Sequence, residues 1–525
     1  MMTILPGVTG NSVAATKKTV DTTGNSVRIY GIYMKRASGK ANPSDAYGDA
    51  VLIESDGKYL LMDTGASRPV KDSMKIYESN LVDTLKKMGV EELDVYISHL
   101  HKDHRGGLKP VCQNFKVNNL YLPDLNLCKD YHTPNTDKTI NALYYEQVDK
   151  ALQGINGRNT RIINLVPDVP GKNTHYDYSS DLDKPELQRL SEAMNFAIEN
   201  AEGASTVNVG NVKGKVIGPV GTYTMKQFAS QDGAAGSQEG HYLNNTSLVT
   251  MFDLGKMKYF TGGDIEKIEE GKLAARYGKS LSADIMKVSH HGISTSSSDT
   301  ILSKVSPTWS FNCNNGYGSK NTGRNGHSKY GYYYGVENGK HTIIFQVNDN
   351  RVRIYKDTND NGIPDERPVT GWVSSNGRYQ YYSGSGYLQK GWAQLGSSKY
   401  YLGGKSGFRY TGKHKISGVN CSFSSSGVLT KPGKPSKVKI RSMKSTKKKV
   451  KIKWRKASGA GKYEVYRATS SKGQYMKVAT LKGSARSYTN TKPVYGKRYY
   501  YKVRGTKSTA GTTIYGSFSA AKRSK

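Results

Sequence analysis

Short stretches of alternating hydrophobic and polar residues recur from residue 26 onwards, and this period of two predicts strands. The first such stretch is 26–34, and a second at 50–65 predicts a hairpin whose turn lies at 55–57. An amphipathic pattern near 74–89 predicts a helix. The segment 93–98 then predicts a buried strand that ends at a group of histidines.

Strands, helices and glycine-rich loops continue in this way to about residue 355, so we expect one domain over 26–355 and a polar hinge at 356–368. Residues 369–430 contain an internal repeat, because Trp372 and Trp392 are 20 positions apart. A third copy lacks the tryptophan. This period predicts β-hairpins that bury their faces only against neighbouring repeats. From 432 to 525, alternating segments with turn residues between them predict an all-β sandwich.

Length and composition exclude two classes of protein. The 525 residues suggest about three domains, and no run of ~18 apolar residues is present to span a membrane. Four cysteines lie far apart, which excludes a disulfide framework and a zinc knuckle. The first 18 residues contain no apolar segment typical of a signal peptide, although the later domains resemble extracellular modules.

The net charge of +36 is concentrated in the C-terminal third. Residues 431–525 contain 28 lysine or arginine residues and one acid, Glu464. Residues 1–366 contain 42 basic and 41 acidic residues. The tail therefore favours an anionic polymer as a partner, whereas the first 366 residues lack the charge of a nucleic-acid channel.

The densest group of potential ligands follows the strand at 93–98. Residues 99–104 have the sequence His-Leu-His-Lys-Asp-His, and Arg-Gly-Gly comes next. Imidazole and carboxylate are typical ligands of catalytic zinc sites. Because the chain has only 11 histidines, three within six positions indicate a metal site rather than a polar loop with chance histidines.

Two later strands also end in potential ligands. One ends in Gly262-Gly263-Asp264, and the other, over 284–288, is followed by His290 and His291. Each of these stretches alone also fits an ordinary turn. Together with the first loop they place several ligands after strands, where loops build active sites.

These motifs resemble the metallo-β-lactamase superfamily, and 60–65 is similar to its first motif. The resemblance covers about 26–350 and implies an α/β four-layer αββα sandwich with metals at one edge of the two sheets. Within the superfamily, the sequences at 244–249, 283–298 and 325–327 are similar to the ComEC-like hydrolase domain. The combination with aromatic wall-binding repeats is instead similar to the phosphorylcholine esterase group.

The resemblance implies two divalent metal ions, which we expect to be zinc, bridged by a hydroxide that attacks the substrate. One ion would be held by His99, His101 and the bridging Asp264. The other would be held by Asp103, His104, Asp264 and one of His290 and His291, with His291 preferred. The full set of implied metal ligands is His99, His101, Asp103, His104, Asp264, His290 and His291.

The motifs also suggest roles for four other residues. Asp63 is expected to orient the histidine loop rather than bind metal. Asn245 stands where β-lactamases have a histidine, which argues against β-lactam hydrolysis, and His241 is a possible substitute. His327 either donates to the substrate or leaving group, as a catalytic residue with Asp103 and Asp264, or is a surface histidine that takes no part.

Two features outside this domain suggest further ligands. The segment Asp357–Asp365 resembles half of a calcium loop, but Pro368 stands where the last acid belongs, so a polar hinge is the alternative. The repeats resemble choline-binding repeats, in which aromatic walls form cages for quaternary ammonium by cation–π attraction. The alternative is aromatic packing of hairpins. The expected cage residues are Trp372, Tyr381, Tyr382, Trp392, Tyr400 and Tyr401.

Three functional hypotheses remain open. The first is an extracellular, wall-associated metal-dependent hydrolase of phosphodiesters, such as a teichoic-acid phosphorylcholine esterase, whose C-terminal domains bind wall polymer. The last of those domains resembles fibronectin type III. The second is a ComEC-like extracellular nuclease acting on DNA, which the balanced charge of 1–366 disfavours. The third is a surface adhesin without catalysis, which the nearly complete set of expected ligands disfavours.

Overall fold

The computed structural model forms two compact units, 1–369 with 384–387, and 370–383 with 388–525. The aromatic repeats and the C-terminal sandwich, which we expected as separate domains, therefore belong to one unit. Contacts that join them include Ser458 Oγ donating to Gly418 O at 2.8 Å. The structure describes residues 26–34, 48–65, 80–99, 101–123, 160–167, 202–221, 223, 238–313, 322–335, 341–358, 365, 367–494, 496–509 and 512–524.

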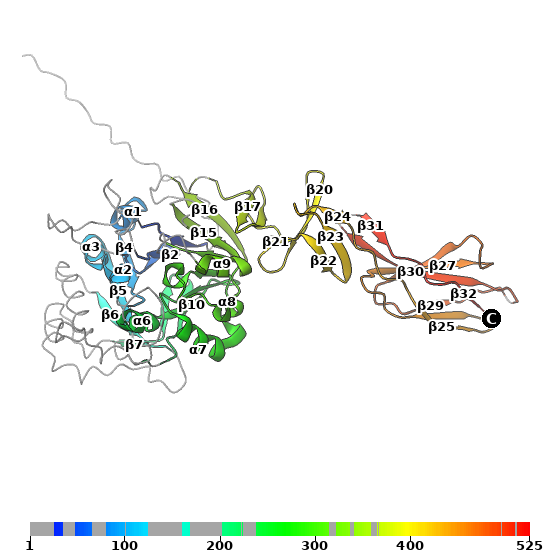
Figure 1. The fold of residues 1–525 in the computed structure, drawn as a ribbon, viewed down its shortest axis with the longest axis horizontal. Helices are drawn as coiled ribbons and strands as arrows, with labels where there is room; N and C mark the ends of the chain where they lie inside the picture. The colour runs from blue at the N-terminus through cyan, green and yellow to red at the C-terminus, as the bar shows by residue number, and fades with distance from the viewer. Residues whose placement is uncertain are drawn as a thin grey trace, which may run out of the picture. The chain divides into compact units, whose positions relative to one another are not determined.

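Two mixed β-sheets form the centre of the N-terminal unit (Figure 1). The nine-stranded sheet has the order β16-β15-β1-β2-β3-β4-β5-β6-β7, and the seven-stranded sheet has the order β14-β13-β12-β11-β10-β9-β8. Neighbours from β3 to β7 and from β11 to β14 are parallel. The first sheet comprises β1 Val27–Gly31, β2 Val51–Ser55, β3 Lys58–Met62, β4 Glu92–Tyr96, β5 Lys116–Pro123, β6 Arg161–Leu165, β7 Glu202–Ala204, β15 Thr342–Asn348 and β16 Arg351–Asp357. The second comprises β8 Thr206–Val209, β9 Val212–Gly218, β10 Val249–Asp253, β11 Lys258–Thr261, β12 Ile285–Lys287, β13 Trp309–Phe311 and β14 Tyr332–Tyr334.

The predicted hairpin is confirmed as β2 and β3, which pair antiparallel from Val51–Met62 to Ser55–Lys58. Its two turn residues, Asp56 and Gly57, both have positive φ, at 51° and 68°. A two-residue turn of this kind matches the twist of the strands and favours Asp-Gly. The local sequence therefore sets the register of the strand that leads to Asp63.

Helices cover the outer face of each sheet. Leu85 of α1 and Val111 of α3 pack with the nine-stranded sheet, whereas Leu273 of α7 and Leu302 of α8 pack with the seven-stranded sheet. The sheets face each other, because Tyr96 Oη lies 3.0 Å from Thr250 Oγ1. The helices are α1 Leu81–Lys87, α2 Lys102–Arg105, α3 Leu108–Asn114, α6 Gln238–Asn245, α7 Lys267–Tyr277, α8 Asp299–Val305 and α9 Thr322–Tyr330, with 3₁₀ turns at Gly278–Leu281 and Ser289–Gly292.

The predicted helix at 74–89 is observed as α1 over Leu81–Lys87, and 66–79 lie outside the described residues. The described helices and sheets are thus layered as helix, sheet, sheet, helix. Strands β3, β4, β11 and β12 all run towards the same edge of these layers. The carboxyl ends of parallel strands meet at one edge of a sheet, so the loops after these four strands converge.

The C-terminal unit consists of three small sheets, each built around one hairpin, and a sandwich. In the first two hairpins Trp372 pairs with Tyr381 and Trp392 with Tyr401, whereas Lys413 takes the equivalent place in the third. The hairpin strands are β17 Gly371–Ser375, β18 Arg378–Tyr382, β19 Gly391–Leu395, β20 Ser398–Gly403, β21 Phe408–Arg409, β22 Gly412–Ile416, β23 Val419–Phe423 and β24 Leu429–Lys431. The sandwich strands are β25 Ile440–Ser445, β26 Val450–Trp454, β27 Lys462–Ala468, β28 Met476–Lys482, β29 Ser487–Asn490, β30 Tyr500–Thr509, β31 Thr512–Tyr515 and β32 Lys522–Arg523.

The C-terminal strands form two sheets with a shared core, β25-β26-β29 and β28-β27-β30-β31, with β32 paired to β30. Their shared core contains Trp454, Tyr463 and Val503, all buried. Both sheets alternate inward apolar and outward polar residues, as antiparallel strands with one solvated face do.

Candidate metal centre

The loop after β4 is held in place by Asp63, which follows β3. The Ser98 backbone N–H donates to Asp63 Oδ1 at 2.7 Å, and Ser98 Oγ donates to Asp63 Oδ2 at 2.8 Å. The same Oδ2 lies 2.7 Å from His104 Nδ1. Asp63 therefore contacts the histidine loop and fixes one ring nitrogen of His104, which leaves His104 Nε2 facing the centre of the site.

Asp264, which follows β11, lies at the centre of the cluster. Its Oδ2 is 3.1 Å from His104 Nε2 and 3.2 Å from His291 Nε2, and His99 Nε2 is 4.0 Å away. Ligand atoms of Asp49, His104, Asp264 and His291 all lie within 4.8 Å of one another, and all four residues are buried. A buried group of imidazoles and carboxylates with this spacing could hold a metal ion.

The two histidines after β12 point in different directions. His291 Nε2 lies 3.0 Å from Asp103 Oδ2, inside the cluster. His290 Nδ1 instead lies 2.8 Å from Thr295 Oγ1 and 3.3 Å from a carboxylate oxygen of Glu266, outside it. Both backbones have positive φ, at 48° and 52°, a conformation that costs energy for residues other than glycine. Of the two candidates, only His291 joins the cluster.

His99 and His101 lie beside one another, with His99 Nε2 3.0 Å from His101 Nδ1. Burial lowers the pKa of His101 to about 4. Burial and the neighbouring His104 lower the pKa of His99 well below its usual range. Both rings are therefore neutral near pH 7, which is the form of imidazole that binds metals.

His104 and His291, which contact carboxylates, instead have raised pKa values. Although burial alone would lower it, Asp264, Asp63 and Asp103 together raise the pKa of His104 to about 10. Asp264 and Asp49 likewise raise the pKa of His291 well above its usual range, against the effect of burial. Protons on these rings balance the charge of the buried carboxylates.

Two members of this site were missed in the sequence. Asp49 lies two residues before the start of β2, and Lys287 is the last residue of β12, with its side chain 2% exposed. Lys287 Nζ contacts Asp49 and lies 3.6 Å from Asp264 Oδ1. Despite burial, Lys287 and His291 lower the pKa of Asp49 to about 2, so Asp49 stays ionised. A lone acid before a strand gives no signal in a sequence, but a lysine at the inward end of an apolar strand is unusual enough to be noticed.

Asn245 and His241 lie outside the cluster, around Glu266. Asn245 Oδ1 accepts from the backbone N–H groups of Glu266 and Glu269, each at 3.3 Å. His241 Nδ1 lies 2.8 Å from Glu266 Oε1. The alternative in which His241 substitutes as a ligand is therefore not supported by its position.

His327 is fully buried between two hydroxyl groups. Its Nδ1 lies 2.8 Å from Ser310 Oγ, and its Nε2 lies 2.9 Å from Ser297 Oγ. Burial lowers the pKa of His327 to about 3, so the ring is neutral. The structure places it in the interior rather than on the surface, and its contact with a substrate stays a prediction.

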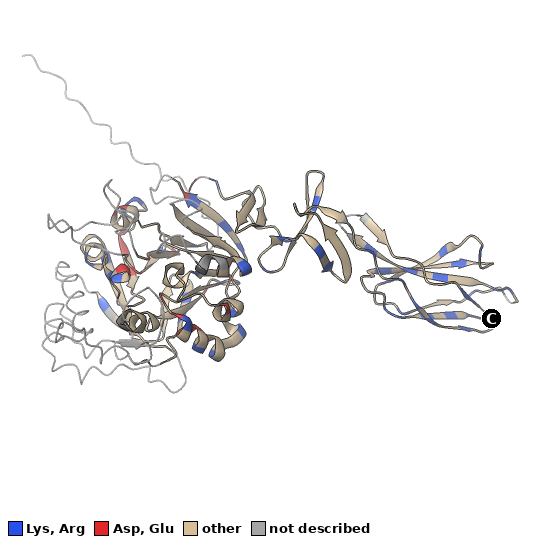
Figure 2. Cartoon of the chain, in the orientation of Figure 1, with Lys and Arg blue, Asp and Glu red and all other residues tan. Residues whose placement is uncertain are grey.

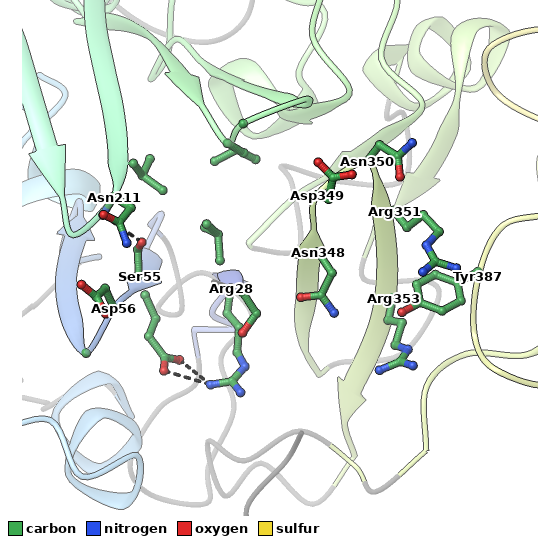
Figure 3. Close-up of a pocket in the computed structure, with 17 residues that line it drawn as sticks. Arg28, Ser55, Asp56, Asn211, Asn348, Asp349, Asn350, Arg351, Arg353 and Tyr387 are labelled. Carbon is green, nitrogen blue, oxygen red and sulfur yellow. Dashed lines mark hydrogen bonds and ion pairs between the residues drawn. The ribbon is translucent and has the colours of Figure 1, made fainter. Parts of the chain in front are cut away.

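A cleft of about 960 Å³ lies at the other end of the strands (Figure 3). Gly57, which lines the cleft, lies just before β3, whereas Asp63, which lies beside the metal cluster, comes just after β3. Figure 3 shows Arg351 and Arg353 beside Tyr387 and Arg28 bonded to its neighbouring carboxylate, which is Glu54 at 2.9 Å. This cleft therefore belongs to the edge opposite the metal cluster and shares no residue with it.

The expected aromatic cage is only partly assembled. Trp372 lies 5.1 Å from Tyr381 and 5.0 Å from Tyr400 between ring centroids, and Trp392 lies 5.1 Å from Tyr401. Tyr382 does not take part, which corrects the prediction. It is fully buried and donates to Gln380 Oε1, because neighbouring residues of a strand face opposite sides.

The first aromatic group consists of Trp372 with Tyr381 and Tyr400, and an arginine of the chain lies against its tryptophan. The guanidinium carbon of Arg409 lies 4.1 Å from the ring centroid of Tyr379 and 5.5 Å from that of Trp372. Its Nε is buried, with no hydrogen-bond partner among the described residues. A guanidinium held by ring faces makes the same kind of cation–π contact that a quaternary ammonium would make.

Replacing Arg409 by Gln should therefore open the first aromatic group and raise its affinity for choline by up to about 10-fold, the range of one cation–π contact. Isothermal titration of the full chain with choline measures this. Arg378→Gln is the control, since Arg378 stacks on Phe408 at 3.7 Å instead. Equal affinities for the three proteins would show that Arg409 does not fill a cation site.

Of the calcium-loop candidates, the structure describes only Asp357 and Asp365. Asp357 is buried, and Asp365 Oδ1 accepts from Thr358 N and Thr358 Oγ1, both at 3.1 Å. The candidates Asn359, Asn361 and Gly362 lie outside the described residues. The calcium site stays a prediction.

Comparison with known proteins gives partial matches. A family model described as "Anti-Pycsar protein Apyc1" matches residues 34–142, which include the histidine loop. No curated protein matches the chain. A fibronectin type III-like protein from Clostridium thermocellum is 27% identical, over 18% of this chain and 92% of that one, with a TM-score of 0.15.

Two choline-binding proteins are also similar in part. CbpF in complex with ipratropium is 32% identical over 15% of this chain and 24% of that chain, with a TM-score of 0.13. The choline binding domain of Spr1274 in Streptococcus pneumoniae is 31% identical over 12% of this chain and 76% of that chain, with a TM-score of 0.12. This chain thus spans about a quarter of CbpF. None of the described helices is long and apolar enough to cross a membrane.

Proposed function

We propose that the N-terminal unit is a metal-dependent phosphodiesterase with the αββα fold of the metallo-β-lactamase superfamily. The observation that carries the proposal is the buried convergence of His104 Nε2 and His291 Nε2 on Asp264 Oδ2, at 3.1 and 3.2 Å. Asp264 Oδ1 is also buried, faces Lys287 Nζ at 3.6 Å and accepts no hydrogen bond from any described residue. A buried carboxylate in this state fits the coordination of a cation.

Two ligand groups share Asp264 in this proposal. The first adds His99 and His101, and the second adds Asp103, His104, His291 and Asp49. This mixture of nitrogen and oxygen donors suits zinc. When bound, such ions lower the pKa of a coordinated water towards ~7 and stabilise charge on phosphoryl oxygens.

The chain's own residues prepare this site. Asp63 fixes the His104 ring, so its Nε2 faces Asp264. His99 and His101 are neutral and present lone pairs. His104 and His291 carry protons that a metal must displace, so we expect metal uptake to release protons.

A phosphorylcholine ester of teichoic acid is the first candidate substrate. It is supported by the aromatic repeats, which suit a wall-associated enzyme acting on a choline-bearing polymer. Asn245, in place of the histidine of β-lactamases, supports a phosphodiester over a β-lactam. We therefore propose an extracellular, cell-wall-associated protein.

The anti-Pycsar match over 34–142 favours a second candidate of the same reaction class. That candidate is a nucleotide phosphodiester, which includes DNA and cyclic nucleotides. The near-neutral charge of 1–366 argues against a long nucleic-acid channel but not against a small nucleotide.

The test is turnover by purified protein of known zinc content. We expect about two metals per chain and selective cleavage of p-nitrophenyl phosphorylcholine over bis-p-nitrophenyl phosphate, a cyclic mononucleotide and single-stranded DNA. Selective cleavage of a nucleotide would instead support the second candidate. Bound metal without cleavage of any of the four would overturn the phosphodiesterase proposal.

A further inference from the structure

One face of the C-terminal sandwich consists of lysines and hydroxyl groups. In β26, Val450, Ile452 and Trp454 point into the core, whereas Lys451 and Lys453 between them are exposed. Residues directly opposite in antiparallel strands share a face. The register therefore places Lys444 and Thr489 beside Lys451, and Ser442 and Ser487 beside Lys453.

This lysine face, defined as Ser442, Lys444, Lys451, Lys453, Ser487 and Thr489, has no acid to balance it. The only acid in residues 370–525 is Glu464. It lies on β27 of the other sheet, where Lys477 Nζ donates to it at 3.1 Å and Arg504 Nε at 2.8 Å. Figure 2 shows lysine and arginine along the strands of this sandwich.

An arrangement of this kind is unfavourable for the free protein. Lys444 lies directly opposite Lys451, and like charges in opposite positions destabilise a sheet. A bound polyanion would remove this repulsion by neutralising both charges and releasing counterions. The lysine face thus has the charge pattern of a binding surface that is complete only with an anionic partner.

We infer that the lysine face binds a flexible chain of phosphodiester-linked polyols, the chemistry of teichoic acid. Residues two apart in a strand are about 7 Å apart, so Lys451 and Lys453 can contact successive phosphates of an extended chain. The serine and threonine hydroxyls beside them can bond to the polyol. This inference deepens the proposed wall association and does not depend on catalysis.

The composition of the face favours a polyol phosphate over nucleic acid. Proteins that bind single-stranded nucleic acid without sequence preference stack its bases on aromatic side chains. The lysine face has no aromatic residue among its six positions. Tyr488, on the same strand as Ser487 and Thr489, packs against the core instead.

The test is binding of fluorescent poly(glycerol phosphate) to the full chain in an Asp264→Asn background, so that hydrolysis cannot consume the probe. The triple variant Lys444→Gln, Lys451→Gln and Lys453→Gln should bind at least 10-fold more weakly at low salt. For this variant, the slope of log K against log salt concentration should be shallower by about 2, as expected for three lost phosphate contacts.

The control removes the same charge elsewhere, from the exposed Lys472, Lys492 and Lys497. It should change affinity less than 3-fold. Arginine at positions 444, 451 and 453 should retain binding, which separates loss of charge from misfolding. Equal losses in the control and face variants, or tighter binding of a dT oligonucleotide of equal charge, would overturn the inference. Failure of phosphodiesterase activity alone would leave it intact.

Discussion

Replacing Asp264 by Asn should abolish phosphodiester hydrolysis and reduce metal content to background. Loss of a residue that only orients a ligand costs about 10–100-fold in metal affinity or activity, and Asp264 contacts the cluster directly, so we expect a loss above ~100-fold. An amide has the shape of the carboxylate but cannot balance the protonated or metal-bound cluster. Metal content by mass spectrometry and turnover of the best substrate measure the effect.

Asp253→Asn is the matched control, because Asp253 is an exposed acid at the end of β10. It should keep both metal and activity. Near-wild-type activity in the Asp264 variant would contradict the proposed centre. Retention of metal with loss of activity would instead show that Asp264 acts on the substrate rather than as a ligand.

The sequence was most informative where chemistry and local structure coincide. The hairpin at 51–62 depends on Asp56-Gly57, and only a few residue pairs adopt that turn readily. The histidine loop and Gly-Gly-Asp each follow a strand, and parallel strands bring such loops to one edge. Their convergence on Asp264 was therefore predictable from the sequence.

Long-range contacts were not predictable in the same way. Asp49 and Lys287 are 238 positions apart, and nothing near Asp49 indicates that it would meet β12. Arg409 reaches Trp372 and Tyr379 because β21 lies against the first hairpin, a contact that no repeat period encodes. The position of His327 follows likewise from packing between Ser297 and Ser310.

Helix α7 begins with two buried carboxylates whose ionisation opposes folding. Glu270 accepts from Ser297 N at 2.6 Å and from Ser298 N at 2.9 Å, and Glu269 accepts from Val220 N at 2.6 Å. Despite these donors, burial raises the pKa of each carboxyl from 4.5 to about 7. Between these values the folded state binds more protons than the unfolded state, so stability falls as pH rises.

Replacing Glu270 by Gln should therefore make the N-terminal unit more pH-tolerant. At pH 5 the carboxyl is protonated when folded, so the variant should differ there mainly by the one backbone N–H that the amide nitrogen cannot accept from, a cost of about 1–3 kcal/mol that is the same at every pH. Relative to wild type it should gain on the order of 2–3 kcal/mol between pH 5 and pH 8, since one pKa unit corresponds to ~1.4 kcal/mol. Glu269→Gln should behave similarly.

The measurement is the urea concentration at which α7 loses half of its hydrogen-exchange protection. The protein is equilibrated in urea at each pH, and the exchange label is then applied at one fixed pH. Glu91→Gln, at an exposed position, should show no such gain. A parallel pH dependence in wild type and Glu270→Gln would mean that the carboxyl is ionised in the folded protein, held by the two serine amides.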